Sequence, residues 1–283
     1  MRSAADETRS PASFYLELLK RTLTRYDLEP EWRYVPYDNT QPGLGPGLRR
    51  GVQALIRRRG LELVWPHRTD REVREWGRDW PDAAETMIGF ARIEQLQAAV
   101  EDVIARGIPG DLIETGVWRG GACIFMRGVL AAHGVTDRTV WVADSFAGLP
   151  EASSEYPADT AGLPFWEMPG LVVSQEEVRR NFEKYGLLDD QVRFLKGWFK
   201  DTLPAAPIEQ LAVLRLDGDM YESTIQALEA LYPKVSAGGY VIVDDYGAVE
   251  GCRLAVDDYR GEHGIAAPLV SINGAGVYWQ VAD

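Results

Sequence analysis

The feature that most constrains the fold of this chain is a series of short, almost continuously apolar runs after residue 110. They occupy 111–115, 139–143, 192–195, 211–216 and 239–243. Such runs are typical of strands that are buried on both faces of a parallel sheet. Helical patterns lie between them, at 121–132, 175–185, 222–232 and 251–262. Runs 269–272 and 277–281 flank Asn273-Gly274 and indicate a hairpin. We therefore predict an α/β fold with a doubly wound, mostly parallel sheet and an antiparallel C-terminal hairpin.

The first 110 residues follow a different pattern, which is helical and irregular. We expect helices after Pro11, over 48–59 and over 91–106, and an exposed loop over 37–47. The predicted organisation is a helical N-terminal extension and lid over 1–110, followed by the sheet domain over 111–283. Residues 147–172, here the lid segment, interrupt the alternation of strands and helices. A connection of that length is usually a lid or binding loop, and a disordered insertion is the alternative.

Charge and composition exclude several classes of protein. Of the 283 residues, 30 are lysine or arginine and 43 are aspartate or glutamate, which gives a net charge of −13. This excess of acid disfavours binding to nucleic acid. The sequence has no signal-peptide core and no apolar run near the ~20 residues that a membrane span needs. Cys123 and Cys252 lie in apolar helical stretches, which indicates buried, reduced thiols in a cytoplasmic protein.

The turn after the first predicted strand has features of a nucleoside-binding site. The strand ends at Glu114, and Gly116 and Gly120 permit a tight turn with close ligand approach, although such turn glycines are common. The turn lacks the G-x-G-x-x-G cradle for a pyrophosphate. Asp144 ends the second strand, where a carboxylate can accept hydrogen bonds from ribose hydroxyls; a helix-capping or solvated aspartate is the alternative. A ribose-bearing cofactor without pyrophosphate is consistent with S-adenosylmethionine. Trp198, after the third strand, could stack on adenine or pack in the core.

Four carboxylates end two strands that should be neighbours. Asp217 and Asp219 follow one strand, and Asp244 and Asp245 follow the next. These side chains would repel one another unless a cation lies between them. A divalent ion with oxygen ligands, such as Mg²⁺, would remove the repulsion. The alternative is that some of these acids cap helices and the others face water.

Five segments resemble the macrocin O-methyltransferase (TylF/MycF) family over roughly residues 80–265. They are TMIG (86–89), DLIETGVWRGG (111–121), ADSFAGLP (143–150), LDGDMYEST (216–224) and CRLAVDDYR (252–260). The resemblance implies a Rossmann-like class I methyltransferase that uses S-adenosylmethionine and a divalent cation, usually Mg²⁺. It also implies that the substrate is a sugar hydroxyl on a natural product such as an antibiotic, and that the chain forms a homodimer.

The resemblance also implies roles for individual residues. Asp217, Asp244 and Asp245 would be the metal ligands, and Asp219 the general base. Glu114 and Gly116 would hold the methionine part of the cofactor. The remaining cofactor contacts would come from Gly120, Asp144, Ser145 and Trp198. Thr86, Met87 and Ile88 would close over the cofactor from the N-terminal side.

We therefore predict metal-dependent methyl transfer to a sugar hydroxyl. Asp219 would accept the hydroxyl proton, and the lid segment would exclude water. The main alternative is a metal-dependent phosphoester hydrolase that uses the same acids. A nicotinamide-dependent oxidoreductase would need the missing pyrophosphate turn, and a non-catalytic binding protein would leave the acids without a purpose.

Overall fold

A seven-stranded sheet forms the centre of the molecule. The computed structural model of the chain describes residues 10–28, 32–36, 46–68 and 70–282. The strand order is β5-β4-β3-β6-β7-β9-β8, in which β3 to β7 are parallel and β9 runs antiparallel to both of its neighbours. The predicted doubly wound sheet with an antiparallel C-terminal edge is therefore confirmed. The strands are β3 (Asp111–Thr115), β4 (Val140–Asp144), β5 (Val192–Lys196), β6 (Leu211–Leu216), β7 (Val235–Val243), β8 (Val270–Ser271) and β9 (Val277–Gln280).

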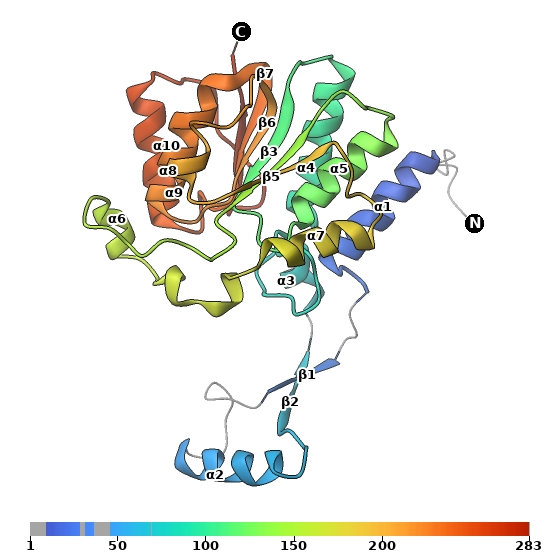
Figure 1. Cartoon of the computed structure of the whole chain (residues 1–283), viewed down its shortest axis with the longest axis vertical. Coiled ribbons are helices and arrows are strands. Elements are labelled where there is room, and N and C mark those ends of the chain that lie inside the picture. The colour runs from blue at the N-terminus through green and yellow to red at the C-terminus, as the bar shows by residue number, and fades with distance from the viewer. Residues whose placement is uncertain (1–9, 29–31, 37–45, 69, 283) are drawn as a thin grey trace.

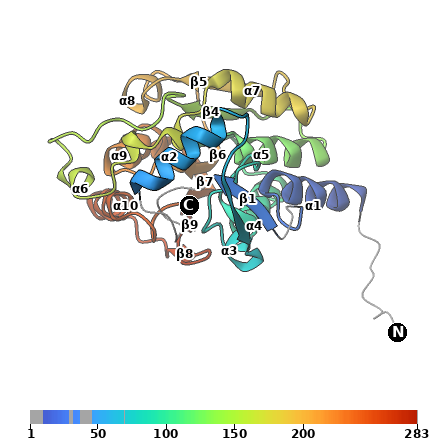
Figure 2. The same cartoon turned by 90° about the horizontal axis from the view of Figure 1, so that it is seen from below.

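Helices cover both faces of this sheet, which is why its central strands are apolar on both sides (Figures 1 and 2). Successive side chains of β3 enter different cores, because Leu112 packs in one apolar cluster and Ile113 in the other. The first cluster joins the sheet to α4 (Gly89–Ala105), α5 (Gly121–Ala132), α7 (Gln175–Lys184) and α1 (Pro11–Thr24). The second joins it to α8 (Phe199–Thr202), α9 (Tyr221–Leu231), η3 (Tyr232–Lys234) and α10 (Glu250–Glu262).

Local sequence signals set several helix ends. Ser10 caps α1 by accepting a hydrogen bond from Ser13 N at 3.1 Å, and Pro11 occupies the first turn. Ser174 caps α7 in the same way by accepting from Glu177 N at 3.2 Å. Gly186 follows α7 at φ 65°, a left-handed conformation that glycine adopts without strain. The predicted helices after Pro11 and over 175–185 are therefore confirmed.

Two strands in the N-terminal part were not predicted. β1 (Trp32–Pro36) and β2 (Val64–Arg68) pair antiparallel, and Figure 1 shows them with α2 (Pro46–Arg57) apart from the main sheet. The description of residues 1–110 as helical and irregular is wrong in this respect. α2 confirms the helix expected over 48–59, and the short helix α3 (Arg71–Glu75) precedes α4. Of the predicted loop 37–47, residues 37–45 lie outside the described residues and the last two begin α2.

The lid segment contains α6 (Pro157–Thr160) and two short 3₁₀ turns, η1 (Phe165–Glu167) and η2 (Pro169–Leu171). It is held to the body of the molecule in part by Trp118, whose Nε1 donates to Gly170 O at 2.9 Å. Both cysteines are buried free thiols, as predicted. Within the described ranges, no helix is long and apolar enough to cross a membrane.

The order of the strands places a crevice at the centre of the sheet. From β3 the chain builds outward to β4 and β5, then returns to form β6 on the opposite side of β3. In open α/β sheets, ligands bind at such a reversal, outside the carboxyl ends of the strands. The ends of β3 and β6 therefore mark where a site is expected.

Candidate active site

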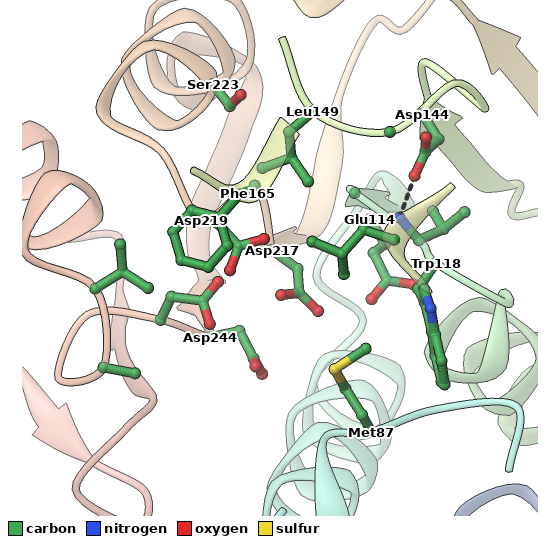
Figure 3. Close-up of a pocket in the computed structure, with 18 of the residues that line it drawn as sticks. Met87, Glu114, Trp118, Asp144, Leu149, Phe165, Asp217, Asp219, Ser223 and Asp244 are labelled. Atoms are coloured by element: carbon green, nitrogen blue, oxygen red, sulfur yellow. Dashed lines mark hydrogen bonds between the residues drawn. The ribbon is translucent and has the colours of Figure 1, made fainter. Parts of the chain in front are cut away.

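A cavity of about 680 Å³ lies at the carboxyl ends of β3, β4, β6 and β7. It brings together every predicted site residue except Gly120, namely Thr86, Met87, Ile88, Glu114, Gly116, Asp144, Ser145, Trp198, Asp217, Asp219, Asp244 and Asp245. Figure 3 shows Asp217, Asp219 and Asp244 gathered on one side, and Asp144 and Trp118 on the other. The lid segment adds Leu149, Leu163 and Phe165 to the lining.

Gly120 contributes to packing rather than to the cavity wall. It precedes α5 at φ 85°, and a Cβ there would lie 2.7 Å from Val178 Cγ1 in α7. Close packing between α5 and α7 therefore accounts for this glycine.

Gly116 is required where the turns after β3 and β6 meet. A Cβ at this position would lie 1.9 Å from the carbonyl oxygen of Asp217, and the glycine is at φ 84°. The two turns thus touch through their backbones, and no other residue type could fill the position without moving one of them.

The strand register brings the acidic residues together. Leu216 at the end of β6 pairs with Val243 at the end of β7, so Asp217 and Asp244 follow paired residues. Asp217, Asp244 and Asp245 each offer a carboxylate oxygen, and these oxygens lie within 4.8 Å of one another. Asp245 Oδ2 is buried and has no hydrogen-bond partner. Three convergent hard oxygen donors, one of them unpartnered, fit a divalent cation such as Mg²⁺.

Two buried arginines, which sequence reasoning missed, hold this cluster. Arg215 lies inside β6 with its side chain 1% exposed, and it binds Glu114, Asp217 (2.7 Å) and Asp244. Arg92 reaches from α4, binds Asp244, and donates to Ile88 O at 2.7 Å. The available signal was a single charged residue inside the apolar run LAVLRL. Such a residue is rarely buried without a charged partner.

The cluster contains more carboxylates than guanidinium groups, and the pKa values of several of its carboxyl groups are raised. Burial, reinforced by repulsion from neighbouring carboxylates, raises the pKa of Asp219 to about 8. Burial also raises the pKa of Asp245 well above its usual range, and the nearby aspartates add to the effect. The pKa of Glu114 rises to about 7 because its burial outweighs the attraction of Arg215. A cation placed among these groups would lower all three values.

Asp219 is presented to the cavity by an unusual turn. Its φ is 56°, and Met220 N donates to Gly218 O at 2.5 Å, which closes a three-residue turn around Asp219. A non-glycine residue with this backbone is strained and persists only where its surroundings fix it.

The opposite side of the cavity carries the features expected for a nucleoside. Asp144 accepts hydrogen bonds from Val117 N (2.8 Å) and Phe146 N (2.7 Å), which orients its carboxylate beside the turn after β3 (Figure 3). Each carboxylate oxygen can accept a further bond. Trp198 lines the cavity and is 37% exposed, so it is not a core residue. An indole ring at such a position can stack on a nucleobase.

Comparisons with known proteins agree on one family. The family described as macrocin-O-methyltransferase (TylF) matches residues 12–281 of this chain. A demethyldecarbamoylnovobiocin O-methyltransferase from Streptomyces niveus is 61% identical over 210 residues, which are 74% of this chain and 80% of that protein. The 8-demethyl-8-(2,3-dimethoxy-alpha-L-rhamnosyl)-tetracenomycin-C 4'-O-methyltransferase of Streptomyces olivaceus is 58% identical over 219 residues, 77% of this chain and 84% of that protein. The solved structure of the O-methyltransferase NovP superposes with a TM-score of 0.82 and 49% identity, over 96% of this chain and 100% of NovP.

Proposed function

Since the chain belongs to the macrocin-O-methyltransferase family, it is an S-adenosylmethionine-dependent O-methyltransferase, and we propose that it methylates a sugar hydroxyl of a glycosylated natural product with the help of a divalent cation. The sugar acceptor is supported by the Streptomyces olivaceus relative, whose name specifies a rhamnosyl 4'-hydroxyl. The observation that carries the cation is the convergence of three carboxylate oxygens within 4.8 Å. Because the chain belongs to a family of O-methyltransferases, the phosphoester hydrolase considered from the sequence is set aside.

We propose that the donor and the cation occupy opposite sides of the cavity. Asp144 would bind the ribose hydroxyls, and Trp198 would stack on the adenine. The methionine part would lie near Glu114 and Gly116, and the other contacts would come from Ser145 and the segment 86–88. Gly120, which does not line the cavity, would act by packing α5 against α7.

The metal ligands in this proposal are Asp217, Asp244 and Asp245. Bound there, a divalent cation would act as a Lewis acid that makes a nearby hydroxyl more acidic. Arg92 and Arg215 hold Asp244 from two sides and so fix the direction of its carboxylate. The buried Asp245 oxygen would gain the partner that it lacks.

Asp219 would accept the proton of the acceptor hydroxyl. It lies two residues beyond Asp217 and lines the same cavity, so it can reach a hydroxyl held near the acid cluster. A neighbouring cation would lower the raised pKa of Asp219, which leaves its carboxylate ionised and able to accept the proton. The lid segment covers this side with Leu163 and Phe165, and water excluded there cannot compete for the methyl group.

A methylation assay tests the proposal. The enzyme is incubated with S-adenosylmethionine and a panel of glycosides, with Mg²⁺ or with EDTA, and products are followed by mass spectrometry. We expect one methyl group to be added to a sugar hydroxyl with Mg²⁺ and little product with EDTA. Equal turnover in both conditions would contradict the cation, and methylation of only non-sugar hydroxyls would contradict the acceptor class. A cytoplasmic location and a homodimer stay predictions from the sequence.

A further inference from the structure

One buried carboxylate ties the lid segment to the body of the molecule. Asp159, in α6, is 5% exposed and accepts hydrogen bonds from Tyr221 N at 2.7 Å and Glu222 N at 3.0 Å. Helix α10 also packs against this carboxylate, since a Cβ on Gly251 would lie 2.8 Å from Asp159 Oδ1. Figures 1 and 2 show α6 beside α9 and α10.

This carboxylate acts as the cap of α9. The first N–H groups of a helix have no partner within the helix and need an outside acceptor. The residue at the N-cap position, Met220, makes no side-chain cap hydrogen bond. Asp159 supplies the acceptor from a segment 62 residues earlier, and its negative charge suits the positive end of the helix dipole.

The capped turn comes directly after Asp219. The strained turn at φ 56° ends at Met220, and the two N–H groups that Asp159 accepts belong to the next two residues. Strain of this kind persists only where neighbouring contacts fix the backbone on both sides. On one side, the Asp217 carbonyl packs against Gly116. On the other side, Asp159 supplies a fixing contact from outside α9.

We propose that Asp159 is a positioning residue that couples the docked lid segment to the orientation of Asp219. When α6 is docked, its carboxylate holds the first turn of α9 and thereby keeps Asp219 in the strained turn that faces the cavity. When α6 leaves, the turn loses its outer fixing contact and Asp219 turns away. Asp159 does not itself line the main cavity, so it acts through the backbone. The inference rests on the proposed role of Asp219 as proton acceptor.

A second contact between the same elements supports the coupling. The ring of Tyr156, at the start of α6, packs on the ring of Tyr221 with their centroids 5.7 Å apart. The Tyr221 hydroxyl donates to Asp258 in α10 at 3.0 Å. The lid segment, α9 and α10 therefore meet around Tyr221. Movement of α6 would change the contacts of both helices.

Hydrogen exchange tests the structural step without any activity measurement. The ligand-free full-length Asp159→Ala protein is compared with wild type and with Glu155→Ala, which removes an exposed carboxylate from the same segment. Loss of a helix cap costs about 0.5–2 kcal/mol, so we expect exchange at residues 221–224 to rise about 2- to 30-fold in Asp159→Ala alone. Wild-type protection of these amides in Asp159→Ala would overturn the proposal. Asp159→Asn, which keeps one acceptor oxygen, should give intermediate exchange and shows whether loss of the cap, rather than misfolding, is the cause.

Steady-state kinetics test the functional step. Asp159→Ala should lower kcat about tenfold while the KM for S-adenosylmethionine stays within about twofold, because Asp159 lies away from the donor side. In the Asp219→Asn background the same change should slow turnover little further, since its effect passes through Asp219. Multiplication of the two effects in the double variant would overturn the coupling.

These outcomes separate this inference from the proposed function. Wild-type turnover in Asp219→Asn would refute Asp219 as proton acceptor, and the coupling with it. A slow Asp219→Asn together with unchanged exchange and kcat in Asp159→Ala would leave the proposed function standing and overturn only the role of Asp159.

Discussion

Replacing Arg215 by methionine should destabilise the protein strongly, and more at high pH than at low pH. The guanidinium is 1% exposed and pairs with the carboxylates of Glu114, Asp217 and Asp244. Methionine keeps an unbranched apolar side chain but has no guanidinium, so these buried acids have one charge partner fewer. Removing one member of a buried ion pair costs about 3–5 kcal/mol. For a chain of this size, a loss of about 4 kcal/mol corresponds to a fall in Tm of about 10 °C.

The pH dependence follows from Glu114. Burial already raises its pKa in the folded protein to about 7. Arg215 opposes this rise more strongly than the hydrogen bond from Cys123 does, so the variant should raise the pKa further. A carboxyl with a raised folded-state pKa binds more protons folded than unfolded, so stability falls as pH rises from the unfolded pKa through the folded pKa. Near pH 5 the folded variant carries Glu114 protonated, and the missing guanidinium matters less. We expect the variant's loss in free energy of unfolding at pH 5 to be about half of its loss at pH 8, or smaller.

The assay is thermal and urea denaturation at pH 5 and pH 8 in EDTA, so that bound metal does not contribute. Arg253→Met is the matched control, because Arg253 pairs with Glu250 (2.9 Å) and Asp257 (3.2 Å) while 40% exposed. Pairs of this kind contribute at most about 1 kcal/mol, so the control should stay close to wild type at both pH values. A deficit for Arg215→Met that is equal at pH 5 and pH 8, or no larger than that of the control, would refute the reasoning.

Three further substitutions test the site. Asp217→Ala should weaken Mn²⁺ binding at least about tenfold by calorimetry, since it removes one of three convergent oxygens; unchanged affinity would place the cation elsewhere. Asp219→Asn should keep Mn²⁺ binding but lower kcat about 10²-fold in single-turnover assays, and wild-type rates would make Asp219 a structural acid. Asp144→Ala should weaken S-adenosylmethionine binding about tenfold or more, measured by calorimetry, while the KM for the acceptor changes little; equal losses for both ligands would contradict its assignment to the ribose.

The sheet could be predicted because its strands are buried on both faces. Burial makes most positions of β3, β4 and β6 apolar, a signal that needs no knowledge of their neighbours. β7 was predicted from Gly239, but it begins at Val235, because the chain bulges near Gly238 and the register with β6 shifts there. β1 was missed because it is five residues long, contains Arg33, ends in proline and pairs with residues about thirty positions later.

The acidic half of the site could also be predicted, whereas its supports could not. Asp217 and Asp244 follow strands directly, and the carboxyl ends of parallel strands meet at one edge. Arg92 lies on a helix more than 100 residues from Asp244, and only the packing of α4 on the sheet brings them together. Asp159 sits in a four-residue helix with no periodic pattern, so its role as a cap for α9 depends entirely on tertiary structure.

The contact at Gly116 has a consequence for engineering the range of acceptors. The turn proposed to serve the donor and the turn that bears the acids touch through their backbones, where a methyl group on Gly116 would lie 1.9 Å from Asp217 O. If the proposed function is right, any substitution that shifts one turn should therefore misalign the methyl donor with the groups that activate the acceptor. Variant libraries aimed at new glycosides should leave both turns intact. They should vary the lid segment instead, where Leu163 and Phe165 line the cavity.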